Sequence, residues 1–129
     1  MPIKTVLDTD KDVTIHIASG DLTFDEIARA ITLFYENPKM PEKVIWDGRH
    51  ASLKNFTSSE LEKIATYPLR FNTEKTKIKG GMRAIVAPRD LDYGLSRVIQ
   101  MFTGIAGEEL PYEIKVFRSM EEAAKWIDE

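Results

Sequence analysis

The chain has 129 residues, of which 43% are hydrophobic and 30% are charged, and its formal net charge is −3. This composition is ordinary for a globular protein, and the length predicts a single domain over residues 1–129. The weak negative charge excludes the basic surface typical of nucleic-acid-binding proteins. Because the chain has no cysteine, disulfides, thiolate nucleophiles and cysteine-ligated metals are excluded too.

Targeting and cofactor signals are also missing from the sequence. No apolar run reaches the roughly 20 residues that a membrane-spanning helix needs. The start, Met1-Pro2-Ile3-Lys4-Thr5, lacks the apolar core of a secretory signal. The two histidines, His16 and His50, do not have the spacing of a metal site. We therefore expect a cytoplasmic protein with no membrane span, no metal and no cofactor.

The first third of the chain predicts a β-hairpin followed by a helix. Strands are expected at Ile3–Asp8 and Val13–Ala18, joined by a turn rich in aspartate. Alternation in the second strand places Val13, Ile15 and Ile17 on one face and Thr14, His16 and Ala18 on the other. Ser19-Gly20-Asp21 then leads to a helix that starts with a capping box of Thr23 and Glu26. Its inner stripe is Ile27, Ala30, Ile31 and Phe34.

The middle of the chain predicts a strand, a long connection and a second helix. The strand is Val44–Asp47 and the connection runs from Gly48 to Asn55. Thr57 and Glu60 form a second capping box, and Pro68 ends the helix near Tyr67. The segment Leu69–Lys79 is read as continued helix plus a basic loop.

The last part predicts two further strand–helix units. An apolar run that starts near Met82 and stops at Pro88 is typical of a strand buried on both faces. The helix Tyr93–Ala106 follows, capped by Asp90 or Asp92 and ended by Gly107. Its apolar stripe is Leu95, Val98, Ile99, Phe102, Ile105 and Ala106. A strand at Tyr112–Phe117 and a helix capped by Ser119 complete the chain.

The predicted order is ββαβαβαβα. Strands that alternate with helices imply a mostly parallel sheet with right-handed crossovers, and the first hairpin adds one antiparallel edge. The fold class is therefore α/β, with a mixed, mostly parallel sheet and helices packed against it.

This order resembles the STAS fold of anti-sigma-factor antagonists. In that family an aspartate ends the third strand, and a serine in an Asp-Ser-Ser-Gly-type motif starts the next helix. Here Val44-Ile45-Trp46-Asp47 matches the strand end and Thr57-Ser58-Ser59-Glu60 stands at the helix start. Thr57 replaces the aspartate and Glu60 the glycine, so the chain is similar to a divergent member.

The resemblance implies a regulatory module whose partner binding is switched by serine phosphorylation. Ser58 and Ser59 are the candidate phosphoacceptors, and a serine kinase or an anti-sigma-type regulator is the implied partner. The contact surface would comprise Thr57–Ser59 and the connection Asp47–His50. A homodimer is compatible with such a module. Serines at helix starts are also explained by capping alone.

The carboxyl ends of the strands are the second candidate surface. In open α/β sheets ligands bind at this edge, where helix N-termini favour anions. The residues expected there to contact a partner are Asp47, Arg49, His50, Thr57 and Arg89, with Arg118 nearby. Asp47 with His50 would also be an acid–base pair. Without a nucleophile-elbow motif the sequence does not favour a hydrolase, and we expect no enzyme.

The helix Tyr93–Ala106 carries more apolar surface than one stripe requires. Tyr93 and Met101 lie off its main face, and Gly94 and Gly104 would leave room for a ligand. These four residues are the candidate groove for an alternative function. In this alternative the protein carries a lipid or another small apolar ligand between helix and sheet, since some divergent STAS relatives resemble CRAL-TRIO lipid-binding domains.

Overall fold

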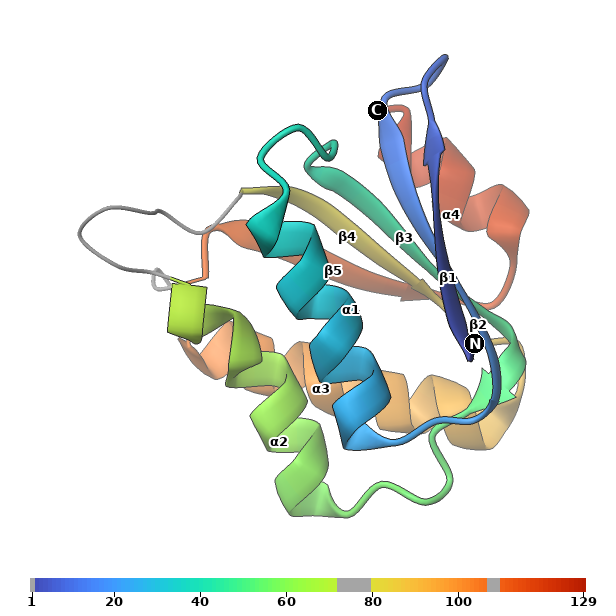
Figure 1. The fold of residues 1–129 in the computed structure, drawn as a ribbon. Coiled ribbons are helices and arrows are strands. Elements are labelled where there is room, and N and C mark those ends of the chain that lie inside the picture. Colours follow the sequence, from blue (N-terminus) through green and yellow to red (C-terminus); the bar gives the residue numbers. More distant parts are fainter. Residues whose placement is uncertain (1, 72–79, 107–109) are drawn as a thin grey trace.

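The computed structural model describes residues 2–71, 80–106 and 110–129. The predicted order of elements is confirmed, with one short 3₁₀ helix added after the second α-helix (Figure 1). The elements are β1 (Ile3–Asp8), β2 (Val13–Asp21), α1 (Phe24–Glu36), β3 (Lys43–Ser52), α2 (Ser58–Thr66), η1 (Tyr67–Phe71), β4 (Gly81–Val86), α3 (Asp90–Ala106), β5 (Tyr112–Phe117) and α4 (Met120–Ile127).

The strands form one mixed sheet in the order β1-β2-β3-β4-β5. β1 pairs with β2 in antiparallel fashion, and every other neighbouring pair is parallel. The predicted α/β class with one antiparallel edge is therefore confirmed.

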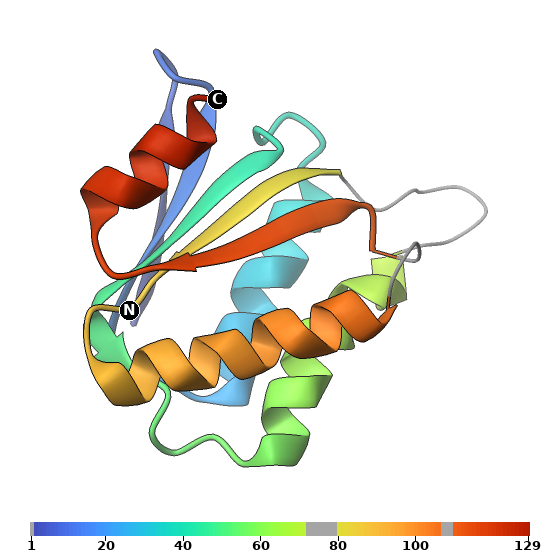
Figure 2. The ribbon, with the colours of Figure 1, turned by 180° about the vertical axis from the view of Figure 1, so that it is seen from behind.

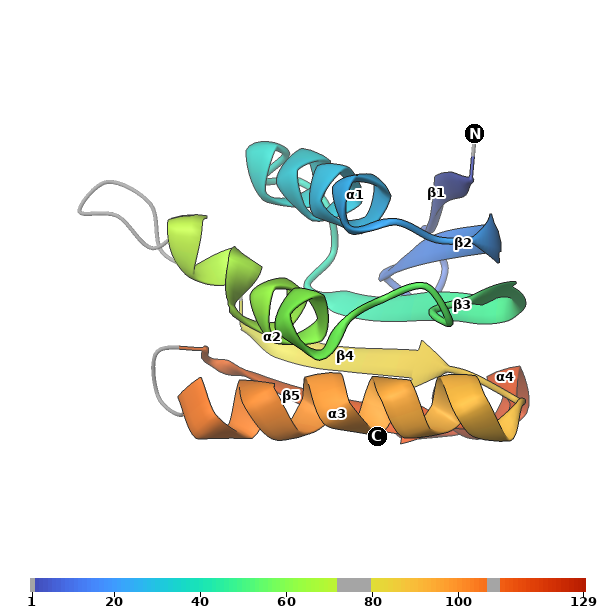
Figure 3. The same cartoon turned by 90° about the horizontal axis from the view of Figure 1, so that it is seen from below.

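Helices α1, α2 and α3 lie side by side on one face of the sheet, and α4 lies on the other (Figures 2 and 3). The reason is the handedness of the connections. Each of the three helices links two parallel strands, and each crossover advances in the same direction across the sheet. Right-handed crossovers that advance in one direction place their helices on the same face. α4 comes after β5 and joins no two strands of the described sheet, so this rule does not set the face on which it lies.

Two hydrophobic cores result, one on each face of the sheet. The larger lies under α1–α3 and the smaller lies under α4. The predicted alternation of β2 is confirmed, because Val13 belongs to the α4 side while Ala18 belongs to the α1–α3 side. Thr14 and His16 share the face of Ala18 and are almost fully buried.

The helix starts follow the predicted capping chemistry. Thr23 and Thr57 each accept a hydrogen bond from the backbone N–H three residues later, and Glu26 and Glu60 complete the two boxes. Ser119 accepts likewise from the N–H of Glu122. These polar contacts are local, which is why the sequence alone reveals them.

Two predicted strand ends were wrong. β2 extends through Ser19–Asp21 and β3 extends through Gly48–Ser52, where a connection was expected. After an irregularity between Ile17 and Ser19 the two strands pair again, down to Asp21 and Ser52. The pairing of one strand with another outweighs the turn propensity of the glycine and aspartate residues.

Five of the six residues of the expected α3 stripe face the core, since Ile99 belongs to it and Leu95, Val98, Phe102 and Ala106 pack against it half-buried. The sixth residue and the polar positions of the helix differ from the expectation. Ile105 is exposed, whereas the most buried residues of the helix are Asp92, Ser96, Ile99 and Thr103. Asp92 does not cap the helix, because its carboxylate accepts hydrogen bonds from Ser52 and Leu53. The predicted helix end at Gly107 and the basic part of Leu69–Lys79 lie outside the described residues.

Gly48 provides a test of the extended β3 strand. A Cβ at this position would lie 2.6 Å from the backbone oxygen of Val86, so any side chain forces β3 and β4 apart. We expect Gly48→Ala to lower the free energy of unfolding by about 1–3 kcal/mol in urea denaturation. Gly94→Ala is the control, because a Cβ on this α3 residue meets nothing within 4 Å. It should stabilise the helix by about 0.5–1 kcal/mol; equal effects of the two changes would contradict this account.

Candidate functional site

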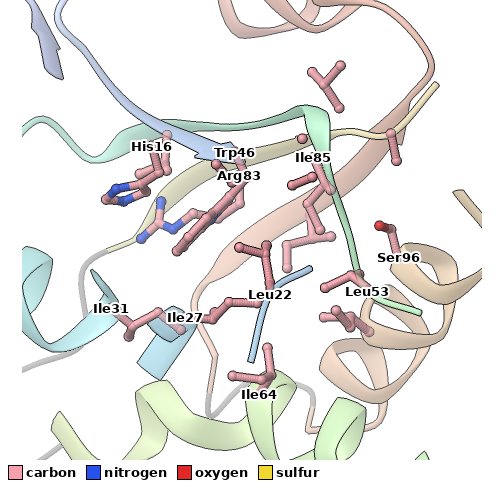
Figure 4. A pocket seen from close by; sticks show the side chains of 18 of the residues that line it. His16, Leu22, Ile27, Ile31, Trp46, Leu53, Ile64, Arg83, Ile85 and Ser96 are labelled. Atoms are coloured by element: carbon pink, nitrogen blue, oxygen red, sulfur yellow. The ribbon is translucent and has the colours of Figure 1, made fainter. Parts of the chain in front are cut away.

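A cavity of about 120 Å³ lies between the sheet and helices α1–α3 (Figure 4). Strands β2, β3, β4 and β5 line it on one side, and residues of the three helices line it on the other. Most protein interiors have few voids larger than a water molecule. A cavity of about 150 Å³ in another protein is large enough to hold benzene. This space is therefore of the size that takes a small ligand.

Aliphatic side chains form most of the cavity wall. Leu22 lies before α1, Ile27 and Ile31 come from α1, and Ile64 comes from α2. All four point into the space enclosed with Ile85 of β4, as Figure 4 shows. The side chains of this part of the wall offer water no hydrogen-bond partner, so this part of the cavity favours an apolar occupant.

Aromatic and cationic side chains gather at one end of the cavity. The ring of His16 packs on Trp46 with 4.2 Å between ring centroids, and Figure 4 shows the Arg83 guanidinium beside it. Arg83 is only 5% exposed. Its guanidinium donates hydrogen bonds to the backbone oxygens of Glu42, Gly80 and Met82, and its carbon lies 4.5 Å from the centre of the Tyr112 ring.

His16 is neutral in this environment. The residue is 1% exposed, and its Nδ1 lies 2.8 Å from the hydroxyl oxygen of Thr5. Burial, and then the positive charge of Arg83, lowers the pKa of His16 to about 4. Burial also raises the pKa of the Tyr112 hydroxyl. Of the side chains of His16, Tyr112 and Arg83, only that of Arg83 is therefore positively charged at neutral pH.

A polar network holds the other end of the cavity together. The carboxylate of Asp92 accepts hydrogen bonds of 2.9 Å from the Ser52 hydroxyl and from the Leu53 N–H. Arg89 Nε donates to the same carboxylate at 3.0 Å, and Arg89 also donates to the backbone oxygen of Ala51. These contacts tie the end of β3 to the first turn of α3.

Asp47 lies at the cavity wall on β3 but is engaged with its own strand. Arg49 donates to both of its carboxylate oxygens, each at 2.9 Å. These hydrogen bonds hold the pKa of Asp47 below its usual range. Arg118 is likewise engaged, since it donates to Asp90 at 2.8 Å and packs over the ring of Tyr93. The three arginines of the predicted anion-binding edge all contact carboxylates of this chain.

The candidate partner-binding residues lie at two places. His50 and Arg89 border one shallow surface hollow together with Gly20 and Asp21. Thr57, Ser58 and Ser59 are exposed at the start of α2 and do not line that hollow. The predicted acid–base pair of Asp47 with His50 is not formed by hydrogen bonding, because the contacts of Asp47 are made by Arg49.

None of the four residues predicted to form a ligand groove on α3 lines the cavity. Gly94 and Gly104 face open space, and Met101 is 54% exposed. Tyr93 packs against Arg118 instead of lining the cavity. The helix is rotated so that Asp92, Ser96, Ile99 and Thr103 line the cavity. The sequence reading followed the apolar residues of α3, whereas its polar residues take part in the buried face.

Sequence reasoning therefore missed Ser96, Asp92 and Arg83. A signal was present for the first two, because positions 92, 96, 99 and 103 follow one another at helical spacing. Polar residues at such positions are not assigned to a buried face from sequence, because their hydrogen-bond partners are unknown. Arg83 lies in a strand that is buried on both faces. The sequence gives no indication of the backbone carbonyls that accept its hydrogen bonds.

The fold has a counterpart among solved structures. The crystal structure of an uncharacterized protein from the DUF3478 family of Shewanella loihica PV-4, described as having a SpoIIAA-like fold, aligns with a TM-score of 0.50. The alignment covers 97% of this chain and 91% of that chain, with 19% sequence identity.

That likeness defines the class of fold. The fold is SpoIIAA-like, which confirms the predicted STAS-like architecture. At 19% identity it carries no information on activity or partners. Models of known protein families and curated protein sequences gave no match.

Residues 2–71, 80–106 and 110–129 were searched for membrane-spanning helices and for clusters of metal-binding side chains. None of their helices has the length and apolar character needed to cross a bilayer. These ranges also hold no group of three or more histidine, aspartate or glutamate side chains placed to share a metal ion.

The burial of His16 predicts a pH-dependent stability. The pKa is about 4 in the folded chain and roughly 6.5 in the unfolded chain, so the unfolded chain binds a proton first as the pH falls. The contribution of His16 should therefore lower the free energy of unfolding by about 2 kcal/mol between pH 7 and pH 5. Urea denaturation at several pH values measures it.

Two variants separate His16 from other groups. In His16→Gln the drop between pH 7 and pH 5 should disappear, even if the variant is less stable overall. His50→Gln, which changes the exposed histidine, should retain the drop. A wild-type stability that stays constant over this range would contradict the buried, neutral state of His16.

Proposed function

We propose that this protein binds a small, mainly apolar molecule in the cavity between its sheet and helices α1–α3. The observation that carries the proposal is the cavity itself, about 120 Å³ within a mostly aliphatic wall. At roughly 24 cal/mol per Å³, an empty cavity of this volume costs about 3 kcal/mol of stability. That is a large part of the 5–15 kcal/mol typical of a folded domain.

Packing by a ligand offsets this cost. A bound apolar molecule restores the dispersion contacts that the wall side chains lack, and it removes its own surface from water. Water is a poor substitute, because a buried water needs two to four polar partners. The wall around Leu22, Ile27 and Ile64 offers none from its side chains.

Binding is favoured over catalysis by the state of the polar side chains. Ser52 donates to Asp92 rather than to a histidine. His16 has a pKa of about 4, which makes it a weak base at neutral pH. Nucleophilic catalysis requires a nucleophile, a base within hydrogen-bond reach and a group that orients the base. The described residues at the cavity do not form such a set.

A variant that fills the cavity tests this function. Ala65 of α2 lines the cavity and is buried. We expect saturating toluene to raise the thermal midpoint of the wild type by on the order of a few degrees. In Ala65→Leu the added side chain should occupy the space, so that toluene no longer raises the midpoint. Differential scanning calorimetry and isothermal titration calorimetry measure both effects.

Ala124→Leu is the matched control, because Ala124 belongs to α4 on the opposite face of the sheet. This variant should respond to toluene as the wild type does. If toluene fails to bind the wild type, or binds Ala65→Leu equally well, the cavity is not the site. Native mass spectrometry of protein purified from its own cells would detect the natural ligand as an additional mass that is lost on denaturation.

A second function, partner binding switched by phosphorylation, is favoured by the start of α2. Ser58 is the first residue of that helix, and both Ser58 and Ser59 are exposed. A phosphate there would meet the positive end of the helix dipole and would add negative charge to the surface. In this function Thr57–Ser59 form the contact surface, and a protein kinase is the modifying partner.

Charge substitution at Ser58 tests the switch. Ser58→Asp should weaken the binding of the protein partner by tenfold or more in a pull-down from cell extract. Ser58→Ala, which removes the hydroxyl without adding charge, should retain the partner. Equal recovery of the same partner by all three proteins would exclude a switch at this residue.

A further inference from the structure

We infer that the ligand of the cavity is a neutral ring compound that carries a hydroxyl group, with phenol as its simplest representative. The inference rests on the proposed ligand-binding function and specifies the chemistry of the same cavity. Its basis is the side chain of Ser96, which lines the cavity from α3 and is 1% exposed.

The hydroxyl of Ser96 makes no hydrogen bond with the described part of the chain. Three threonines within helices behave differently. Thr32, Thr66 and Thr103 each donate to the backbone oxygen four residues earlier, at 2.9–3.1 Å. Ser96 has the same option towards Asp92 and does not take it. Figure 4 shows its oxygen directed towards the other side chains of the cavity wall.

This hydroxyl must border the open space. Among the described residues, every side-chain nitrogen or oxygen that is fully buried has a hydrogen-bond partner. The Ser96 oxygen has none, so it is not occluded by protein atoms, and the space that Ser96 lines is the cavity. A polar group left unsatisfied in such a place is unfavourable. A ligand with a hydroxyl group can satisfy it as donor or acceptor, because serine accepts as well as donates.

The charged groups of the wall favour a neutral ligand. Asp47 and Asp92 both line the cavity, and their carboxylates oppose a bound anion. Each of these two carboxylates is already engaged with an arginine at 2.9–3.0 Å. Arg83 at the far end opposes a bound cation, and His16 is neutral beside it. The polar group that remains for a ligand is the Ser96 hydroxyl, which is uncharged.

The cavity volume favours a single ring. About 120 Å³ is close to the cavity of about 150 Å³ that holds benzene in another protein. Phenol and toluene have the same number of non-hydrogen atoms and differ by a hydroxyl in place of a methyl group. The pair therefore isolates the contribution of Ser96 from that of apolar burial.

The experiment compares both compounds by isothermal titration calorimetry at pH 7, using the full chain. For each protein it yields the ratio of the toluene dissociation constant to the phenol dissociation constant. We expect Ser96→Ala to lower this ratio by about tenfold, because phenol loses its partner and toluene does not. Thr103→Val is the matched control. Thr103 also lines the cavity, but its hydroxyl is satisfied by Ile99, so the ratio should stay as in the wild type.

The outcomes distinguish the two proposals. If neither compound binds the wild type, the proposed function fails. If both bind and the ratio is unchanged in Ser96→Ala, the cavity is a ligand site but the assignment of a hydroxyl-bearing ligand is overturned. Benzoate and benzylamine should each bind at least tenfold more weakly than phenol. Tighter binding of either one would overturn the neutral class.

The stability of the unliganded variant provides a second readout. Because the Ser96 hydroxyl has no partner in the described chain, Ser96→Ala should melt at the same temperature as the wild type or higher. A midpoint lowered by several degrees would mean that the hydroxyl is satisfied within the protein, and it would overturn the inference even if phenol binds.

Discussion

The position of α3 over the sheet depends on the buried carboxylate of Asp92. It accepts hydrogen bonds from Ser52 at the end of β3 and from Leu53, the next residue. Arg89, which directly precedes α3, donates a further hydrogen bond to the same carboxylate. Removing one partner of a buried charged network leaves the other groups unsatisfied, which is costly. The network therefore fixes which face of α3 meets the sheet, and with it the residues that line the cavity.

The cavity follows from how three helices share one twisted sheet. The crossovers place α1, α2 and α3 on the same face, where their side chains must fill the space above four strands. Ala65 and Ala87 are small residues of the cavity wall. The α4 side shows the contrast, since Ala123 and Ile127 pack there with almost no exposure. The cavity described here therefore belongs to the α1–α3 face of the sheet.

Local interactions explain which parts of the fold the sequence could predict. The capping boxes at Thr23 and Thr57 depend on residues three positions apart, so they were read correctly. The ends of β2 and β3 were not, because they depend on pairing between segments about 30 residues apart. The residues of α3 that line the cavity were missed for a similar reason. The apolar residues of α3 indicate a helix, but the placement of its polar residues depends on the hydrogen bonds that Asp92 accepts from Ser52 of β3 and from Leu53 just after it.

The sequence by itself determined the order of the elements, the mixed α/β class and the helix starts, because these follow from periodicity and from contacts within a few residues. It also placed Ser58 and Ser59 at a helix start. Only the tertiary structure decided that His16 is buried and neutral, that Arg83 lies beside it, and that the Ser96 hydroxyl faces a cavity. Each of these depends on side chains from separate elements that fold together, and no local pattern records how such surfaces meet.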